Sequence, residues 1–239
     1  YTEGLWAVTF SASFAAIALL SVTSLFTLQF IRIPKPVAIS LSGAGRPIIE
    51  IMRTPIFIVA VISSTIGYGM MNMLMTSTPL AMQFCGFDFN SSATVIQWHI
   101  VGMFAPSFFT GSIIKRFGVI NVIATGALLQ AGAIGIALSG IDFLNFFAGL
   151  IVLGLGWNFM FIGGTTLLTE AYAPEEKAKV QAAHDFIVFG TVALTAFASG
   201  VLHEKLGWIA VNLIAAVPVS LAFVVAIWYG TQVRRQQST

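Results

Sequence analysis

Long apolar runs separated by short polar segments organise this chain along its length. Each run is almost free of charge and long enough, or nearly so, for the ~20 residues with which a helix crosses ~30 Å of hydrocarbon. The pattern predicts an all-α membrane protein with seven transmembrane helices, near residues 5–30, 54–83, 92–114, 119–139, 144–171, 179–202 and 208–230.

The spacing of these predicted helices is uneven. A long polar connection, 31–53, follows the first helix, whereas the other six are joined by short loops. We therefore expect one separate helix, a linker, and a six-helix bundle over 54–230 with a short tail at 231–239. Small residues let membrane helices approach closely, and we expect them to mark packing faces at Ala131, Gly135 and Ser139 and at Gly154, Gly156, Gly163 and Gly164.

The composition supports a membrane protein and excludes a soluble one. Of the 239 residues, 57% are hydrophobic and 8% are charged, against about 25% charged in soluble domains. A net charge of +2 gives no reason to expect nucleic acid as a partner; the lipid bilayer is the expected surrounding.

The distribution of basic residues predicts the orientation. If the first helix enters from outside, every Lys and Arg except Lys205 falls in the inner connections or the tail. Basic residues concentrate on the cytoplasmic side of membrane proteins, so we expect residue 1 to lie outside and the C-terminus inside. The chain starts at Tyr1 with no basic segment before its first apolar run, and we interpret this start as a cut within a longer protein.

Two pairs of potential metal ligands lie on consecutive predicted helices. Met71-x-x-x-Met75 and His99-x-x-x-Met103 each place two side chains on one helix face, about one turn apart. Thioether sulfur and imidazole nitrogen suit Cu(I), and a histidine inside an apolar span is a functional candidate because its burial is costly. Counted from the outer helix ends, the four residues fall at similar depth, which predicts one Cu(I) site.

Other metals and cofactors fit these residues less well. Zinc prefers cysteine and histidine, calcium and magnesium need several carboxylates, and the haem-attachment sequence Cys-x-x-Cys-His is absent. Cys85, the single cysteine, could capture copper at the outer mouth or have no role, and His184-Asp185 could sense protons or be an interfacial pair. We expect no enzyme activity, no catalytic residue and no cofactor; copper would be the transported substrate.

A second reading treats the methionines as packing residues. Methionine commonly fills gaps in apolar cores, and the chain would then carry an organic solute such as a vitamin, with Trp98 and Asn158 in its pocket. A membrane scaffold without transport is a third possibility, for which the sequence offers no positive feature.

One inner loop resembles a signature of a transporter family. Gly111-Ser-Ile-Ile-Lys-Arg-Phe-Gly118 is similar to the Gly-x-x-x-Asp-Arg-x-Gly loop of the major facilitator superfamily, with Lys115 in place of the aspartate. The resemblance implies that 1–30 is the last helix of an N-terminal half, 31–53 the central cytoplasmic loop, and 54–230 the C-terminal six-helix half. The N-terminal half of the same transporter would be its partner.

Within that superfamily, the chain resembles the CcoA-like copper importers, the CalT group. Their Met-x-x-x-Met and His-x-x-x-Met motifs correspond to Met71, Met75, His99 and Met103, and the stretch from Gly154 to Tyr172 is also similar. This resemblance implies copper uptake by alternating access across a bacterial inner membrane, with residue 1 periplasmic and the C-terminus cytoplasmic, for the assembly of a haem–copper oxidase. The related riboflavin carriers share the scaffold, so riboflavin import is the alternative.

Overall fold

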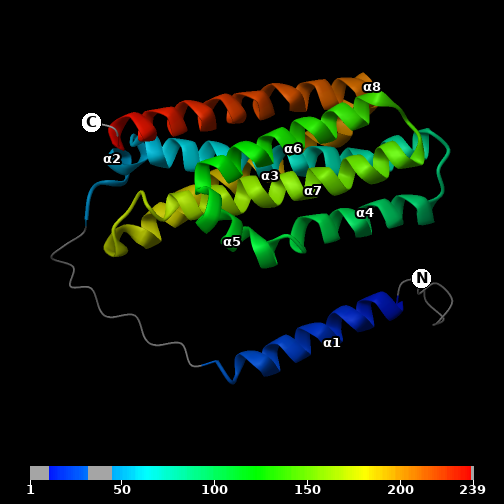
Figure 1. Ribbon diagram of the computed structural model, residues 1–239. Helices are drawn as coiled ribbons and strands as arrows, with labels where there is room; N and C mark the ends of the chain where they lie inside the picture. Colours follow the sequence, from blue (N-terminus) through cyan, green and yellow to red (C-terminus); the bar gives the residue numbers. More distant parts are fainter. Residues whose placement is uncertain (1–10, 32–44, 238–239) are drawn as a thin grey trace. The chain divides into compact units, whose positions relative to one another are not determined.

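The computed structural model describes residues 11–31 and 45–237 (Figure 1). The chain divides into two units, Tyr1–Leu41 and Ser42–Thr239, and each is described by itself. The first contains α1 (Ser11–Leu28), and the second contains α2 (Ile48–Met52), α3 (Pro55–Phe84), α4 (Phe89–Phe104), α5 (Ser107–Phe117), α6 (Val119–Ser139), α7 (Phe143–Leu168), the 3₁₀ turn η1 (Pro174–Glu176) and α8 (Lys177–Gln237).

Helix α1 satisfies four of its hydroxyl groups within its own backbone. The hydroxyls of Ser21, Thr23, Ser24 and Thr27 each donate to the carbonyl oxygen four residues earlier, at 2.8–2.9 Å. A hydroxyl bonded in this way does not need water. These serines and threonines are therefore compatible with an apolar membrane helix.

Five helices are long and apolar enough to cross a membrane: α1, α3, α6, α7 and the continuous α8. Residue Gly207 breaks α8, because its φ of 78° lies outside the helical region, and glycine reaches that region without strain. The predicted span 92–114 is likewise divided, since α4 ends at Phe104 and α5 begins at Ser107. The all-α membrane class is confirmed, whereas the number of crossings stays a prediction.

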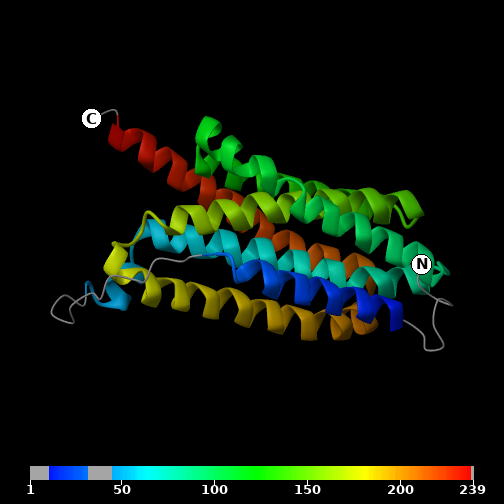
Figure 2. The ribbon, with the colours of Figure 1, turned by 90° about the horizontal axis from the view of Figure 1, so that it is seen from below.

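In the second unit four long segments form a layer. Helix α6 and the part of α8 after Gly207 pack against one side of it. Along this layer, residues 177–206 of α8 pack against α3, α3 packs against α7, and α7 packs against α4 (Figure 2). Helix α6 covers α7 from behind and also packs against α8, with Met160, Ala127 and Ala222 from these three helices in one buried cluster. Helices α3 and α4 make few contacts with each other, because α7 carries most of the packing of α4.

Glycines let α7 approach three neighbours closely. A Cβ atom placed on Gly154 would lie 2.7 Å from the carbonyl oxygen of His99 on α4, and one on Gly156 would lie 2.9 Å from the carbonyl oxygen of Gly126 on α6. On Gly164 it would lie 2.9 Å from the carbonyl oxygen of Ala60 on α3. The predicted packing role of the α7 glycines is confirmed.

The packing face predicted for α6 is wrong. Ala131, Gly135 and Ser139 are exposed in the second unit, and nothing lies within 4 Å of a Cβ atom placed on Gly135. The apolar partners of α6 lie instead on its other side, around Ala127, Ala133 and Ile134. Spacing alone did not distinguish the two sides, because both carry small residues.

Asn158 on α7 stabilises the break between α4 and α5. Its Nδ2 donates to the carbonyl oxygen of Met103 at 2.7 Å and contacts the Ser107 hydroxyl at 2.7 Å, while its Oδ1 accepts from the Thr110 hydroxyl at 2.5 Å. Pro106 has no N–H and cannot continue the helical hydrogen bonds. The buried amide supplies a donor where the backbone lacks one.

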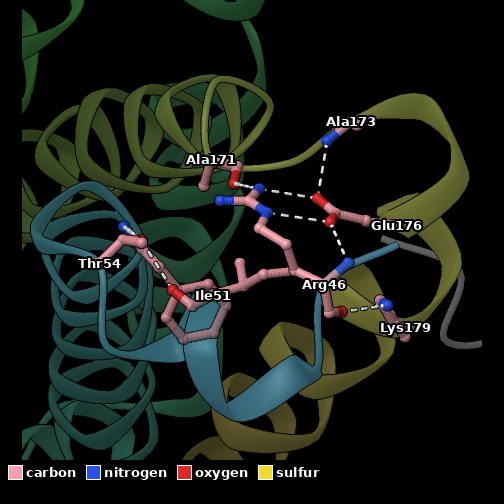
Figure 3. Close-up of polar contacts among 8 residues, drawn as sticks. Arg46, Ile51, Thr54, Ala171, Ala173, Glu176 and Lys179 are labelled. Carbon is pink, nitrogen blue, oxygen red and sulfur yellow. Dashed lines mark hydrogen bonds and ion pairs between the residues drawn. The ribbon is translucent and has the colours of Figure 1, made fainter. Parts of the chain in front are cut away.

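A polar cluster at one end of the bundle joins the segment before α2 to the connection between α7 and α8 (Figure 3). The Arg46 guanidinium donates to both oxygens of Glu176, at 3.0 and 2.8 Å, and to the carbonyl oxygen of Ala171 at 3.0 Å. The backbone amides of Arg46 and Ala173 also donate to Glu176, at 2.7 and 3.0 Å. Lys179 reaches back to the carbonyl oxygen of Arg46.

Candidate functional site

The three methionines predicted as metal ligands lie in the hydrophobic core. Met71 and Met103 are buried, Met75 is half-buried, and all three belong to one cluster with Leu74, Val95 and Leu153 among its other members. Apolar side chains surround these thioethers, as expected of methionines that fill gaps between helices. Their spacing of four follows from the helix face that each pair buries.

His99 is directed towards α7. Its ring is fully buried, and Nδ1 lies 2.6 Å from the carbonyl oxygen of Leu150. Nε2 is also buried and has no hydrogen-bond partner within residues 11–31 and 45–237. Because α4 packs chiefly against α7, the predicted pairs do not lie on two helices in close contact with each other.

The remaining predicted metal or proton sites are separate from these residues. Cys85 is exposed at the end of α3. In the described part of the chain, no three residues among His, Cys, Asp and Glu are grouped so that they could hold a metal ion. His184 is buried, with Nδ1 2.9 Å from Oδ1 of the exposed Asp185.

The two pocket residues named for an organic solute are not together. Trp98 is half exposed on α4 and makes an edge contact with Phe147, with ring centroids 6.1 Å apart. Asn158 is buried and uses its amide at the α4–α5 break. Trp98 and Phe147 belong to a group of rings that also contains Phe87, Phe143, Phe146 and Trp208.

A separate group of rings consists of Tyr68, Phe104, Trp157, Phe161 and Phe189, from here on called the aromatic cluster. The Tyr68 ring lies edge-on to Trp157, Phe161 and Phe189, with centroid distances of 5.3, 5.2 and 5.9 Å. Trp157 and Phe161 are stacked at 5.3 Å, and Phe104 contacts Trp157 edge-on at 5.6 Å. The five rings come from α3, α4, α7 and α8, the four helices of the layer.

The aromatic cluster lies near the middle of these helices. Tyr68 is close to the centre of α3 (Pro55–Phe84), and Trp157 is close to the centre of α7 (Phe143–Leu168). Phe104 adjoins the α4–α5 break, and Phe189 is well inside residues 177–206. The cluster is therefore at mid-height in the bundle, the level at which carriers of inverted-repeat architecture bind their substrates.

The face of α7 that carries the cluster lies between its neighbours in the layer. At about 100° per residue, Trp157 and Phe161 fall between the side that meets α3 at Gly164 and the side that meets α4 at Gly154. Phe104 and Phe189 on the flanking segments are 56% and 52% exposed. Trp157, between them, is 5% exposed, and its Nε1 has no partner within the described residues.

A concave region lies at one end of the bundle. It has a volume of about 880 Å³ and is bordered by the last residues of α3 and by the bend of α8, including Gln83, Cys85, His203 and Trp208. Leu80, the first of its α3 residues, is 12 residues from Tyr68, or roughly 18 Å along the helix. This groove and the aromatic cluster are thus separate sites.

Sequence reasoning missed the aromatic cluster. The available signals were Trp157-x-x-x-Phe161 on one helix face and the mid-helix positions of Tyr68 and Trp157, whose polar atoms are unusual at that depth. The signals were weak, because phenylalanine is abundant in the chain, with 21 residues. Which of these rings meet depends on helix packing.

Comparison with known proteins agrees with this all-helical architecture. Residues 64–239 match the Major Facilitator Superfamily. The chain belongs to this superfamily of transporters and is a membrane protein.

Three relatives narrow the comparison. The chain is 43% identical over 219 residues to the riboflavin transporter RfnT of Brucella anthropi, which covers 90% of the chain and 54% of the relative. It is 31% identical to YddS and 32% identical to YdeG, uncharacterized MFS-type transporters of Bacillus subtilis, over 70% and 65% of the chain and 38% and 36% of these relatives. The chain spans about half the length of the first relative and less of the others.

These relatives correct the copper prediction. The similarity to RfnT, a named riboflavin transporter, contradicts copper uptake and favours the organic-solute alternative. The narrower resemblance to CcoA-like importers is not supported. The physical reason for the error is that Met71, Met75 and Met103 serve the hydrophobic core, a role that produces the same spacing as a ligand pair.

Proposed function

We propose that this chain forms part of a carrier that imports riboflavin, or a solute with a similar planar ring, across the bacterial inner membrane. The observation that carries the proposal is the 43% identity to a riboflavin transporter over 90% of the chain. A similarity that extends over nearly the whole chain includes the central helices, where major facilitator carriers bind their substrates.

The proposal includes the layout expected from the sequence. Residues 1–30 are the last helix of an N-terminal half, 31–53 the central loop, 54–230 the C-terminal half and 231–239 a cytoplasmic tail. Transport proceeds by alternating access, in which two six-helix halves rock about a site near mid-membrane. The N-terminal half supplies the second wall of that site, and residue 1 lies on the periplasmic side.

Riboflavin uptake by cells tests the function. We expect the complete natural protein to restore growth at low riboflavin in a bacterium that cannot synthesise or import it, and to accumulate labelled riboflavin above an empty-vector control. Copper accumulation, measured in the same cells, should equal that of the control. Absence of riboflavin uptake with normal membrane expression would contradict the proposal.

A further inference from the structure

An unpaired hydrogen-bond donor, the indole N–H of Trp157, lies near the middle of the four-helix layer. The indole of Trp157 has one polar group, the Nε1–H, which can only donate. It is buried without a partner within residues 11–31 and 45–237, although a buried tryptophan normally pairs this group. In an apolar, helix-lined interior an unpaired donor is costly. Because the unit's own atoms cover Nε1, an acceptor can reach this N–H only when neighbouring side chains move.

The surroundings of Trp157 specify what kind of acceptor fits. Its ring is stacked on Phe161 and contacted edge-on by Tyr68 and Phe104. Phe104 and Phe189 flank it from α4 and α8 and leave more than half of their surfaces uncovered. Rings of this kind favour offset-stacked or edge-on contacts with another flat ring.

No Lys, Arg, Asp or Glu lies on α3, α4 or α7, and on α8 the nearest to Phe189 is Asp185, one helix turn away. A charged ligand would find no counter-charge on those three helices, whereas a neutral planar ring needs none. The ligand should therefore be flat, neutral and able to accept a hydrogen bond. An uncharged heteroaromatic ring with carbonyl or imine acceptors at its edge has all three properties.

We propose that the aromatic cluster binds the planar ring of the transported solute, with Phe104 and Phe189 on either side, and that the side chains over Trp157 move on binding so that its Nε1–H donates to an acceptor at the ring edge. For riboflavin this is the isoalloxazine ring, and the ribityl chain extends away from the cluster. The inference rests on the proposed function and adds the residues that recognise the ring.

Competition between parts of the substrate tests this assignment. Binding of riboflavin to the complete natural protein in detergent is measured by quenching of flavin fluorescence. Lumiflavin, which has the ring without the ribityl chain, should compete with riboflavin, whereas ribitol should not. Competition by ribitol alone would overturn the assignment.

Substitutions of the two flanking phenylalanines test where the ring of the solute binds. Phe104→Leu and Phe189→Leu should each weaken riboflavin binding about tenfold, as expected from the loss of an aromatic contact. Both side chains are largely exposed, so these variants should fold. Phe197→Leu is the matched control: it makes the same change on α8 at a residue that is 81% exposed and outside the aromatic cluster, and it should bind as wild type does.

The donor is tested separately. Trp157→Phe keeps an aromatic ring and removes only the N–H, and it should weaken binding of riboflavin and lumiflavin by the same factor, about three- to tenfold. A larger loss for riboflavin than for lumiflavin would show that the indole contacts the ribityl chain and would contradict the assignment.

The outcomes separate this assignment from the proposed function. If wild type binds riboflavin and all three variants bind it equally well, the ring site is wrong and the proposed function stands. If wild type binds lumiflavin through Trp157 but does not bind riboflavin, the ring site stands and riboflavin is the wrong solute. Binding of neither compound would overturn both.

Discussion

Glu176 is buried yet charged, because its partners surround it. It accepts hydrogen bonds from the Arg46 side chain and from the backbone amides of Ala173 and Arg46. These donors, the Arg46 side chain foremost, lower the pKa of Glu176 from 4.5 to about 2. The residue lies in the connection between α7 and α8, outside the membrane-spanning segments.

This pKa shift predicts how stability depends on pH. Because the folded-state pKa is below the unfolded value of 4.5, the charged carboxylate stabilises the fold above about pH 4.5, and the effect is lost as pH falls towards about 2. Glu176→Gln should lower the melting temperature at pH 7 and reduce its decline between pH 4.5 and pH 3. Melting curves of detergent-purified protein provide the measurement.

The control for this prediction is the neighbouring residue. Glu175 is exposed, so Glu175→Gln should leave both the melting temperature and its pH dependence close to those of wild type. A Glu176→Gln variant with a wild-type pH profile would show that the ion pair with Arg46 contributes nothing to acid stability.

Residue types alone did not show how the residues of the predicted metal site pack. The sequence shows that Met71, Met75, His99 and Met103 share helix faces in pairs, but it does not show what those faces meet. Burial in one core cluster and the contact of His99 with Leu150 depend on which helices are neighbours. Which helices are neighbours is known only from the packed structure.

Helix α7 provides the clearest example at the element scale, because it contacts α3, α4 and α6 through glycines. Its apolar character identified it as a membrane helix, and its glycines correctly indicated close packing. The break between α4 and α5 was harder to predict, since hydropathy is continuous through Pro106. The same holds at Gly207, where the apolar runs on both sides hide a positive φ.

Substitution of an α7 glycine should separate two helices. A Cβ atom at Gly154 would lie 2.7 Å from the His99 carbonyl oxygen and 2.9 Å from the Met103 amide nitrogen, and backbone atoms of this kind cannot rotate away. Gly154→Ala should therefore destabilise the protein by about 1–3 kcal/mol, as overpacked substitutions do. Thermal unfolding in detergent measures the change.

Gly135 is the matched control on α6. Nothing lies within 4 Å of a Cβ atom at this position, so Gly135→Ala should be neutral or stabilise the helix by up to about 1 kcal/mol. If Gly154→Ala proved as well tolerated as Gly135→Ala, the close packing of α4 on α7 would be contradicted.

At the scale of the whole molecule, hydropathy and charge were sufficient to recognise an all-α membrane protein, and the resemblance of the loop at 111–118 indicated a transporter family. They could not assemble the aromatic cluster, because Tyr68, Phe104, Trp157 and Phe189 come from four helices that are far apart in sequence. The two residue pairs that the sequence did single out, Met71 with Met75 and His99 with Met103, each lie on one face of a single helix. The rings meet only after the layer of four helices has formed.

The orientation of the molecule can be tested at Cys85. This cysteine is exposed after α3, on the side that the distribution of basic residues assigns to the periplasm. A membrane-impermeant maleimide should label the complete protein in intact cells, and Cys85→Ser should abolish that signal. Labelling at Cys85 only after the cells are permeabilised would reverse the orientation.

The packing of α7 also limits how this transporter can evolve. Three of its sides meet other helices at glycine positions. A larger residue at one of these glycines would alter the spacing of the helices and so affect the whole bundle, not only the choice of substrate. Trp157 and Phe161 occupy the side between α3 and α4, where a new side chain changes the contacts of the aromatic cluster and not a close contact between helix backbones. We therefore expect selection for a new solute to act on α7 mainly at these two positions and to leave Gly154, Gly156 and Gly164 unchanged.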